Sequence, residues 1–270
     1  MSKIALLQLA TLPLSQSRLD YYLKICKDKG ANLVVLGEYV LNSFFKEIET
    51  AQPNIIKQQS EEKKQTLCEL SKKYDITIIA PIIMPLKSGF IKCMAKFENA
   101  QVKFTKQQIL MPYPHWNEAK FFANKSEKLN FLTFKYENLK IGVAFGFEAH
   151  FDVTFLNLMS KKIDVLLLPT ASTFESNKRW EELLKMRAFT NNIYILRANR
   201  IGSYKPKPKC QSGDEIWKFY GDSFVVSPFG EIANRLGNDE GILIANIDKK
   251  ELLNAKATWC FSALSGKILC

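Results

Sequence analysis

The sequence predicts an α/β protein in which helices cover the faces of its sheets. Short apolar runs of strand length alternate with amphipathic segments of helix length along the whole chain. The 270 residues, of which 47% are apolar and 24% charged, can form a full core at the upper end of the size of one domain. There is no linker, low-complexity stretch or shift in composition. We therefore expect residues 1–270 to form a single domain.

The first half of the chain predicts three strands and two helices before a hairpin. A strand over 3–9 precedes a helix over 17–29, which has apolar residues at helical spacing and Gly30 as its stop. The elements expected next are a buried strand over 31–36, a helix over 60–74, a strand over 76–80, and a hairpin of strands 89–97 and 101–106 that turns at 98–100.

The second half repeats this alternation. The expected elements are a strand over 139–145, a helix over about 148–160, a strand over 164–168, a helix over 179–191, and strands over 193–198, near 221–227 and over 241–247. Residues 249–270 read as a C-terminal tail, which we expect to serve in oligomerisation.

Charge and hydropathy argue against two classes of partner. The formal net charge of +11 comes mostly from lysines dispersed in pairs along the chain, without a long basic block or a glycine-aromatic RNA signature, so we expect no nucleic-acid partner. The longest apolar runs fall short of the roughly 18–20 residues that a membrane span needs, so we expect no membrane partner.

The cysteines and histidines argue against a metal site. The six cysteines, at 26, 68, 93, 210, 260 and 270, form no C-x-x-C pair, and the chain has only two histidines. We expect no metal and no cofactor. Scattered thiols of this kind are typical of a reducing compartment, and we expect a cytoplasmic protein.

Several segments place polar groups at the ends of predicted strands, where α/β sheets usually build their sites. Glu38 follows the strand over 31–36, Lys106 ends the strand over 101–106, and Glu118 lies in the aromatic-rich loop beyond it. The segment from Lys140 to Phe151 reads as a buried strand that turns sharply into a helix, with Gly146 at the turn. A turn of this kind can display a nucleophile, yet glycine has no side chain.

Taken together, these segments resemble the nitrilase superfamily of carbon–nitrogen hydrolases over nearly the whole chain. In that family a strand-end Glu, a strand-end Lys and a Cys at a strand-to-helix elbow form a triad, and a second Glu assists. The positions that match are Glu38, Lys106 and Glu118, with Gly146 at the cysteine position. The segments 180–188, 198–202 and 219–231 also resemble family motifs.

The resemblance implies a four-layer αββα sandwich and hydrolysis of an amide or an N-carbamoyl amine. It also implies that Phe147, Glu148, Thr170 and Ser172 bind the substrate, and that the chain forms a homodimer or a higher homo-oligomer. In such a triad a thiolate attacks the carbon, a glutamate moves the proton, and the lysine stabilises the oxyanion.

The missing thiol leaves several readings open. Losing a covalent nucleophile costs on the order of 10⁶ in kcat. Cys210 is the one loop cysteine that could approach the site. The chain could be a hydrolase in which water attacks directly with Glu38 as base, or one whose native Cys was changed to Gly. It could instead be an inactive relative that binds a small amide or carbamoyl ligand or serves as a partner subunit.

A further alternative is purely structural. Glycine relieves backbone strain at tight turns, and Glu38, Lys106 and Glu118 could persist as a buried charge network that supports the fold or an oligomer. The elbow also departs from the family beyond position 146, since it reads His150, Phe151, Asp152 and Val153 where an Arg-Phe-Pro-Glu-like run is usual. This broader drift favours natural divergence over a single deliberate substitution.

Overall fold

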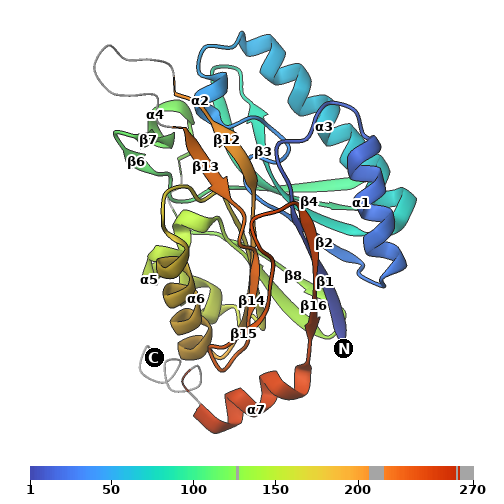
Figure 1. The fold of residues 1–270 in the computed structure, drawn as a ribbon, viewed down its shortest axis with the longest axis vertical. Coiled ribbons are helices and arrows are strands. Elements are labelled where there is room, and N and C mark those ends of the chain that lie inside the picture. Colours follow the sequence, from blue (N-terminus) through green and yellow to red (C-terminus); the bar gives the residue numbers. More distant parts are fainter. Residues whose placement is uncertain (126–127, 207–215, 260, 262–270) are drawn as a thin grey trace.

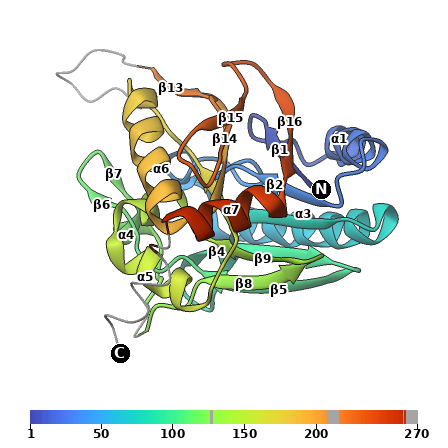
Figure 2. The same cartoon turned by 90° about the horizontal axis from the view of Figure 1, so that it is seen from below.

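Two six-stranded sheets pack face to face between layers of helices. The computed structural model describes residues 1–125, 128–206, 216–259 and 261. Helices α1 (Ser17–Asp28) and α3 (Pro53–Tyr74) lie on one outer side, and α5 (Asp152–Ser160) and α6 (Asn177–Asn191) lie on the other (Figures 1 and 2). The predicted αββα sandwich is confirmed.

The first sheet has the order β16-β1-β2-β3-β4-β5. Strands β1, β2 and β3 run parallel, and the remaining neighbours pair antiparallel. The strands are β1 (Ser2–Gln8), β2 (Leu33–Leu36), β3 (Thr77–Pro85), β4 (Phe90–Glu98), β5 (Gln101–Lys106) and β16 (Gly241–Ile247).

The second sheet repeats this plan, with the order β15-β14-β11-β10-β9-β8 and a parallel centre of β9, β10 and β11. The strands are β8 (Leu132–Tyr136), β9 (Leu139–Val143), β10 (Val165–Thr170), β11 (Tyr194–Asn199), β14 (Phe224–Val226) and β15 (Ile232–Arg235).

The alternation of side chains along each strand separates the apolar layers. On β1, Ile4 and Leu6 join the layer between the two sheets, whereas Ala5 and Leu7 pack under α1 and α3. Because both faces of this strand are covered, it reads as a continuous apolar run rather than an alternating one. The β4–β5 hairpin turns as predicted, at Asn99 and Ala100, which both have positive φ as a tight two-residue turn requires.

Smaller elements gather at one end of the sheets (Figure 1). Their aromatic side chains form a cluster around Phe44, Phe45 and Trp116. The elements are α2 (Phe45–Ile48), β6 (Pro112–Tyr113), β7 (Trp116–Asn117), α4 (Glu118–Phe121), β12 (Ile201–Tyr204) and β13 (Trp217–Tyr220).

The structure corrects several expected elements. Helix α3 begins at Pro53 rather than at 60, because proline is well suited to the first helical turn. The helix expected over 148–160 is divided into a 3-10 helix, η1 (Gly146–His150), and α5. Within the expected tail, α7 (Lys249–Trp259) is a helix that buries Leu252 and Ala255, while 260 and 262–270 lie outside the described residues. Strands β6, β7, β8, β12, β13 and β15 and the short helices α2 and α4 were not predicted.

Within the described ranges, no helix is long and apolar enough to cross a membrane.

Candidate active site

The carboxylate of Glu38 is placed by a close approach between the two sheets. It follows β2 and Gly37, where an added Cβ would lie 3.0 Å from the backbone nitrogen of Arg200. Glycine lets the end of β2 approach the end of β11 this closely, because a Cβ here would press on the backbone of β11 and Arg200. The Glu38 amide then donates to the carbonyl of Thr170 at 3.1 Å, and its side chain, which is 6% exposed, turns inward.

Lys92 on β4 supplies the cation of the site. Its Nζ donates to Oε2 of Glu38 and to Oε1 of Glu118, the latter at 2.6 Å. The same ammonium lies 4.5 Å from the ring centre of Tyr39 and 5.1 Å from that of Phe145. All three charged side chains are buried, so Lys92 is held between two carboxylates and two aromatic faces.

Glu118 begins α4 directly after the β6–β7 hairpin. Asn117 caps this short helix by accepting from the amide of Lys120 at 3.0 Å. The Glu118 carboxylate also accepts from the hydroxyl of Tyr39 and from the amide of Met111. These contacts fix the carboxylate from three separate segments of the chain.

The two carboxylates respond differently to the same burial. Burial raises the pKa of Glu38, and the neighbouring Glu118 adds to the effect, although Lys92 opposes both. For Glu118 burial also favours the neutral form, but Lys92 and the Tyr39 hydroxyl outweigh it and hold its pKa below the ordinary value. Burial disfavours the charged form of Lys92 too, yet the two carboxylates keep its pKa raised. Of the two carboxylates, Glu38 is therefore the one that takes up a proton more readily.

The elbow after β9 is held by a buried carboxylate. Glu148 accepts from the amide of Phe145 at 2.8 Å, and from those of Gln108 at 2.6 Å and Ile109 at 3.2 Å. Burial raises the pKa of Glu148 to about 7 despite these three donors. The Gly146 amide donates to Oε1 of Glu38 at 3.2 Å, so the elbow and Glu38 are joined directly.

Position 146 is crowded. A Cβ added to Gly146 would lie 2.7 Å from Cγ2 of Thr170 and 3.2 Å from Oε1 of Glu38. The φ of Gly146 does not lie in the left-handed region, so backbone strain is not what requires glycine here. The explanation that glycine relieves backbone strain at this turn is therefore wrong. Glycine fits here because the methyl group of Thr170 occupies the space that a Cβ would need.

A cavity of about 40 Å³ opens between these groups, with room on the order of three water-sized molecules. Both carboxylates reach it, and aromatic rings form much of its wall. Its lining residues are Glu38, Met111, Trp116, Glu118, Gly146, Phe147, His150, Thr170, Ala171 and Trp180. The indole N–H of Trp116 is buried without a hydrogen-bond partner.

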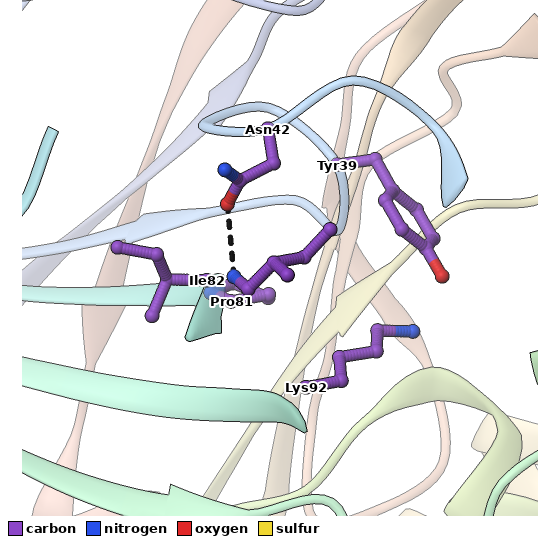
Figure 3. Close-up of a pocket in the computed structure, with 6 residues that line it drawn as sticks. Tyr39, Asn42, Pro81, Ile82 and Lys92 are labelled. Atoms are coloured by element: carbon purple, nitrogen blue, oxygen red, sulfur yellow. Dashed lines mark hydrogen bonds between the residues drawn. The ribbon is translucent and has the colours of Figure 1, made fainter. Parts of the chain in front are cut away.

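A second, smaller hollow of about 10 Å³ lies at the base of Lys92, enough for at most one water. Figure 3 shows the Lys92 side chain extending alongside the ring of Tyr39, with Asn42 on the other side of the hollow. Asn42 accepts from the amide of Ile83 at 2.9 Å and donates to Ser60. Asn42 therefore anchors the loop that carries Tyr39.

The structure brings together Glu38, Glu118 and Gly146 but not Lys106. The register pairs Lys106 with Cys93, which places Gln107 opposite Lys92. Because side chains alternate along a strand, Gln107 is buried and Lys106 is exposed. The prediction of Lys106 as the site cation was wrong, and Lys92 on the neighbouring strand occupies that role.

The sequence contained a signal for Lys92. It is a single lysine within the apolar run from Phe90 to Ala95, and lysine is rarely found fully buried unless it is paired. A lysine in such a strand indicates a buried anionic partner.

The four expected binding residues divide into two groups. Phe147 and Thr170 line the cavity. Glu148 is occupied with backbone amides, as described above. The Ser172 hydroxyl accepts from the guanidinium of the buried Arg197 at 2.9 Å, so Ser172 belongs to a supporting network beside the site.

Neither a thiol nor a metal centre is found at this site within the described ranges. Cys26, Cys68 and Cys93 are free, and none of them lines the cavity. Cys210 lies outside the described residues. No group of three or more histidine, cysteine, aspartate or glutamate side chains in the described part of the chain could hold a metal ion.

Comparisons with known proteins identify the family and the fold. The sequence profile of the carbon-nitrogen hydrolases matches residues 3–257. An N-carbamoylputrescine amidase of Oryza sativa is 22% identical, over 95% of this chain and 89% of that protein. The omega-amidase NIT2 of Xenopus tropicalis is 25% identical, over 93% and 90%. A match to the N-carbamoylputrescine amidase of Solanum tuberosum covers only 53% of this chain and 49% of that protein, at 27% identity.

Solved structures show the same fold. A carbon-nitrogen hydrolase from Helicobacter pylori superposes with a TM-score of 0.83 at 21% identity, covering 96% of this chain and 94% of the other. An amidase from Nesterenkonia gives a TM-score of 0.74 at 20% identity, covering 95% and 94%. A mutant of an amidase from Nesterenkonia sp. AN1, with a TM-score of 0.73 at 19% identity over 95% of this chain and 97% of the other, shows the result of acrylamide addition at its active site cysteine.

Proposed function

Because this chain belongs to the carbon–nitrogen hydrolase family, we propose that it keeps the family's small-ligand pocket but lacks thiol-dependent hydrolysis. The ligand would be a small amide or N-carbamoyl compound, as the names of its amidase relatives suggest. The single observation that carries this proposal is the elbow itself. Gly146 offers no nucleophile, and the methyl group of Thr170 fills the adjoining space.

The chemistry of the cavity supports the ligand class. Two carboxylates line the cavity and accept hydrogen bonds, which suits the N–H₂ group of an amide or N-carbamoyl ligand. Lys92 is already paired with both carboxylates, so the three side chains together carry one net negative charge. An anionic ligand of equal size should therefore be rejected.

The same groups explain why hydrolysis should be slow. Glu38, with its raised pKa, is suited to proton transfer. Without a nucleophilic side chain, however, no covalent intermediate can form, and water has to attack the substrate directly. Removal of the nucleophile from a catalytic triad costs on the order of 10⁶ in kcat. We expect ammonia release close to the uncatalysed background.

Two measurements on the purified chain test this proposal. Ammonia release is followed with primary amides, N-carbamoyl amines and nitriles, and binding of acetamide, urea and acetate is followed by calorimetry and by the shift in Tm. A ligand at about 100 times its Kd should stabilise the protein by about 2.7 kcal/mol. Turnover at an ordinary enzymatic rate would refute the loss of hydrolysis. Failure of every amide and urea-type ligand to bind would refute the retained pocket.

A homo-oligomer in the cytoplasm remains part of the proposal. Large apolar side chains on the outer helices are about half exposed, which supports coverage by a second copy of the chain. They are Val153 and Leu156 on α5, Met186 on α6 and Leu253 on α7. Sedimentation of the parent and of a Leu156→Glu variant tests this: a variant that stays in the parent's oligomer would count against an interface at α5.

A further inference from the structure

We infer that Thr170 determines whether the elbow can carry a reactive side chain, because its methyl group occupies the space that a nucleophile at position 146 would need. This inference rests on the proposed loss of the thiol and deepens it. The contact of 2.7 Å between Cγ2 of Thr170 and an added Cβ is shorter than real Cβ contacts allow. Something must move before any residue larger than glycine can fit.

The methyl group cannot move easily, since Thr170 is β-branched and its side chain is anchored. Its hydroxyl donates to Oδ1 of Asn199 at 2.9 Å, and this bond fixes χ1. Asn199 is anchored in turn, because its Oδ1 accepts from the backbone amide of Ser172 and its side-chain Nδ2 donates to the backbone carbonyl of Gly221. Rotating the methyl away would break a buried chain of hydrogen bonds.

The elbow cannot move easily either. The amide of Gly146 donates to Glu38, and the preceding amide of Phe145 donates to the buried Glu148. On the other side, the carbonyl of Thr170 accepts from the amide of Glu38 at 3.1 Å. Glu38 therefore holds both walls of the contact, the elbow through its side chain and Thr170 through its backbone amide.

The remaining surroundings suit a thiol. An added Cβ would lie 3.2 Å from Oε1 of Glu38, which puts a sulfur one bond further within reach of that base. The elbow thus still offers a proton acceptor, and the methyl of Thr170 is the main obstacle. The Cβ of Thr170 lies 3.2 Å from the added Cβ, a contact that a shift of a few tenths of an ångström relieves. It follows that G146C alone should not restore a reactive thiol, whereas G146C combined with T170S should, because serine keeps the hydroxyl bond and removes the methyl.

A double-mutant cycle tests this inference. The proteins are the parent, T170S, G146C and G146C/T170S, with G146C/T170V as a control that removes the hydroxyl but keeps the methyl shape. Each is treated with iodoacetamide, which a thiolate sulfur attacks at its methylene carbon as the C–I bond breaks and iodide leaves. Labelling is read by mass spectrometry on the tryptic peptide 141–161, which contains position 146 and no native cysteine.

We expect G146C to lower Tm by about 3–9 °C in the Thr170 background and by much less in the T170S background. Labelling of the introduced thiol should be at least about tenfold faster in G146C/T170S than in G146C or G146C/T170V. Equal Tm losses in both backgrounds, or fast labelling of G146C/T170V, would overturn the role of the methyl.

Folding failure does not leave the inference untested. If G146C does not fold, G146A and G146A/T170S measure the same steric coupling through Tm, because alanine adds only the Cβ. If G146A is no better tolerated beside serine than beside threonine, Thr170 is not the obstacle. Turnover by the parent chain would instead refute the proposed function, and it can be observed whatever the cycle shows.

Discussion

Replacing Lys92 by methionine should be among the most destabilising single substitutions in this chain. The ammonium lies 2.6 Å from Oε1 of Glu118 and contacts Glu38, and the three side chains are at most 8% exposed. At an effective dielectric constant of about 20, one such pair attracts by about 6 kcal/mol before desolvation is subtracted. Breaking a buried pair by removing one partner leaves an uncompensated charge and typically costs about 3–5 kcal/mol. We expect a loss of that size at neutral pH.

Lys106→Met is the matched control, because it removes the same charge from an exposed position fourteen residues away in the sequence. Its effect should stay within about 0.5 kcal/mol. Urea unfolding followed by far-ultraviolet circular dichroism gives the midpoint and slope for both variants. Equal midpoints for Lys92→Met and Lys106→Met would refute the assignment of Lys92 as the buried cation.

The pH dependence of the Lys92→Met variant provides an internal check. Without Lys92, the pKa values of Glu38 and Glu118 in the folded state should rise above the unfolded value of about 4.3, since burial, the largest effect on both, then loses its main opponent. An acid with a raised folded pKa loses stability as pH rises through that window. The deficit relative to the parent should therefore be largest near pH 8 and shrink toward pH 4.

Two further predictions concern the groups around this centre. The pKa of Glu148 is raised to about 7. As the pH rises from about 5 to about 7, the parent should therefore lose stability by on the order of 3 kcal/mol relative to Glu148→Gln. Parallel curves of unfolding free energy against pH for the two proteins would contradict this. Tyr39→Phe removes a buried donor to the Glu118 carboxylate and should cost about 1.5–3 kcal/mol in urea unfolding, whereas Tyr113→Phe, at an exposed ring, should cost almost nothing.

The sequence predicted the fold better than it predicted the site. The continuous apolar runs that identified β1, β2 and β10 are a property of the local sequence, so these strands could be predicted without knowledge of the tertiary packing. The start of α3 was missed because residues 53–59 carry few apolar side chains at helical spacing. Short strands such as β12 and β13 depend on pairing with each other, which their local composition does not reveal.

The error at the site cation has a different cause. Lys106 and Gln107 are neighbours in the sequence, but only one of them can face inward on a strand, and a shift of one residue exchanges the two faces. Gln107 is the residue of the two that is buried, so Lys106 cannot face the site. The buried lysine is Lys92, which lies opposite Gln107 on the neighbouring strand. Strand register is a tertiary property, so the motif indicated the place of the cation without identifying the residue that supplies it.

The remaining question is whether Glu38, Lys92 and Glu118 persist for binding or only for the fold. Buried ion networks are often no more stable than apolar or neutral replacements of the same shape. The triple variant Glu38→Gln/Lys92→Met/Glu118→Gln removes all three charges together and should recover much of the stability lost in Lys92→Met alone. If the network serves a ligand, this stable variant should lose binding of acetamide. Retained acetamide binding would show that the carboxylates are not the groups that hold the ligand.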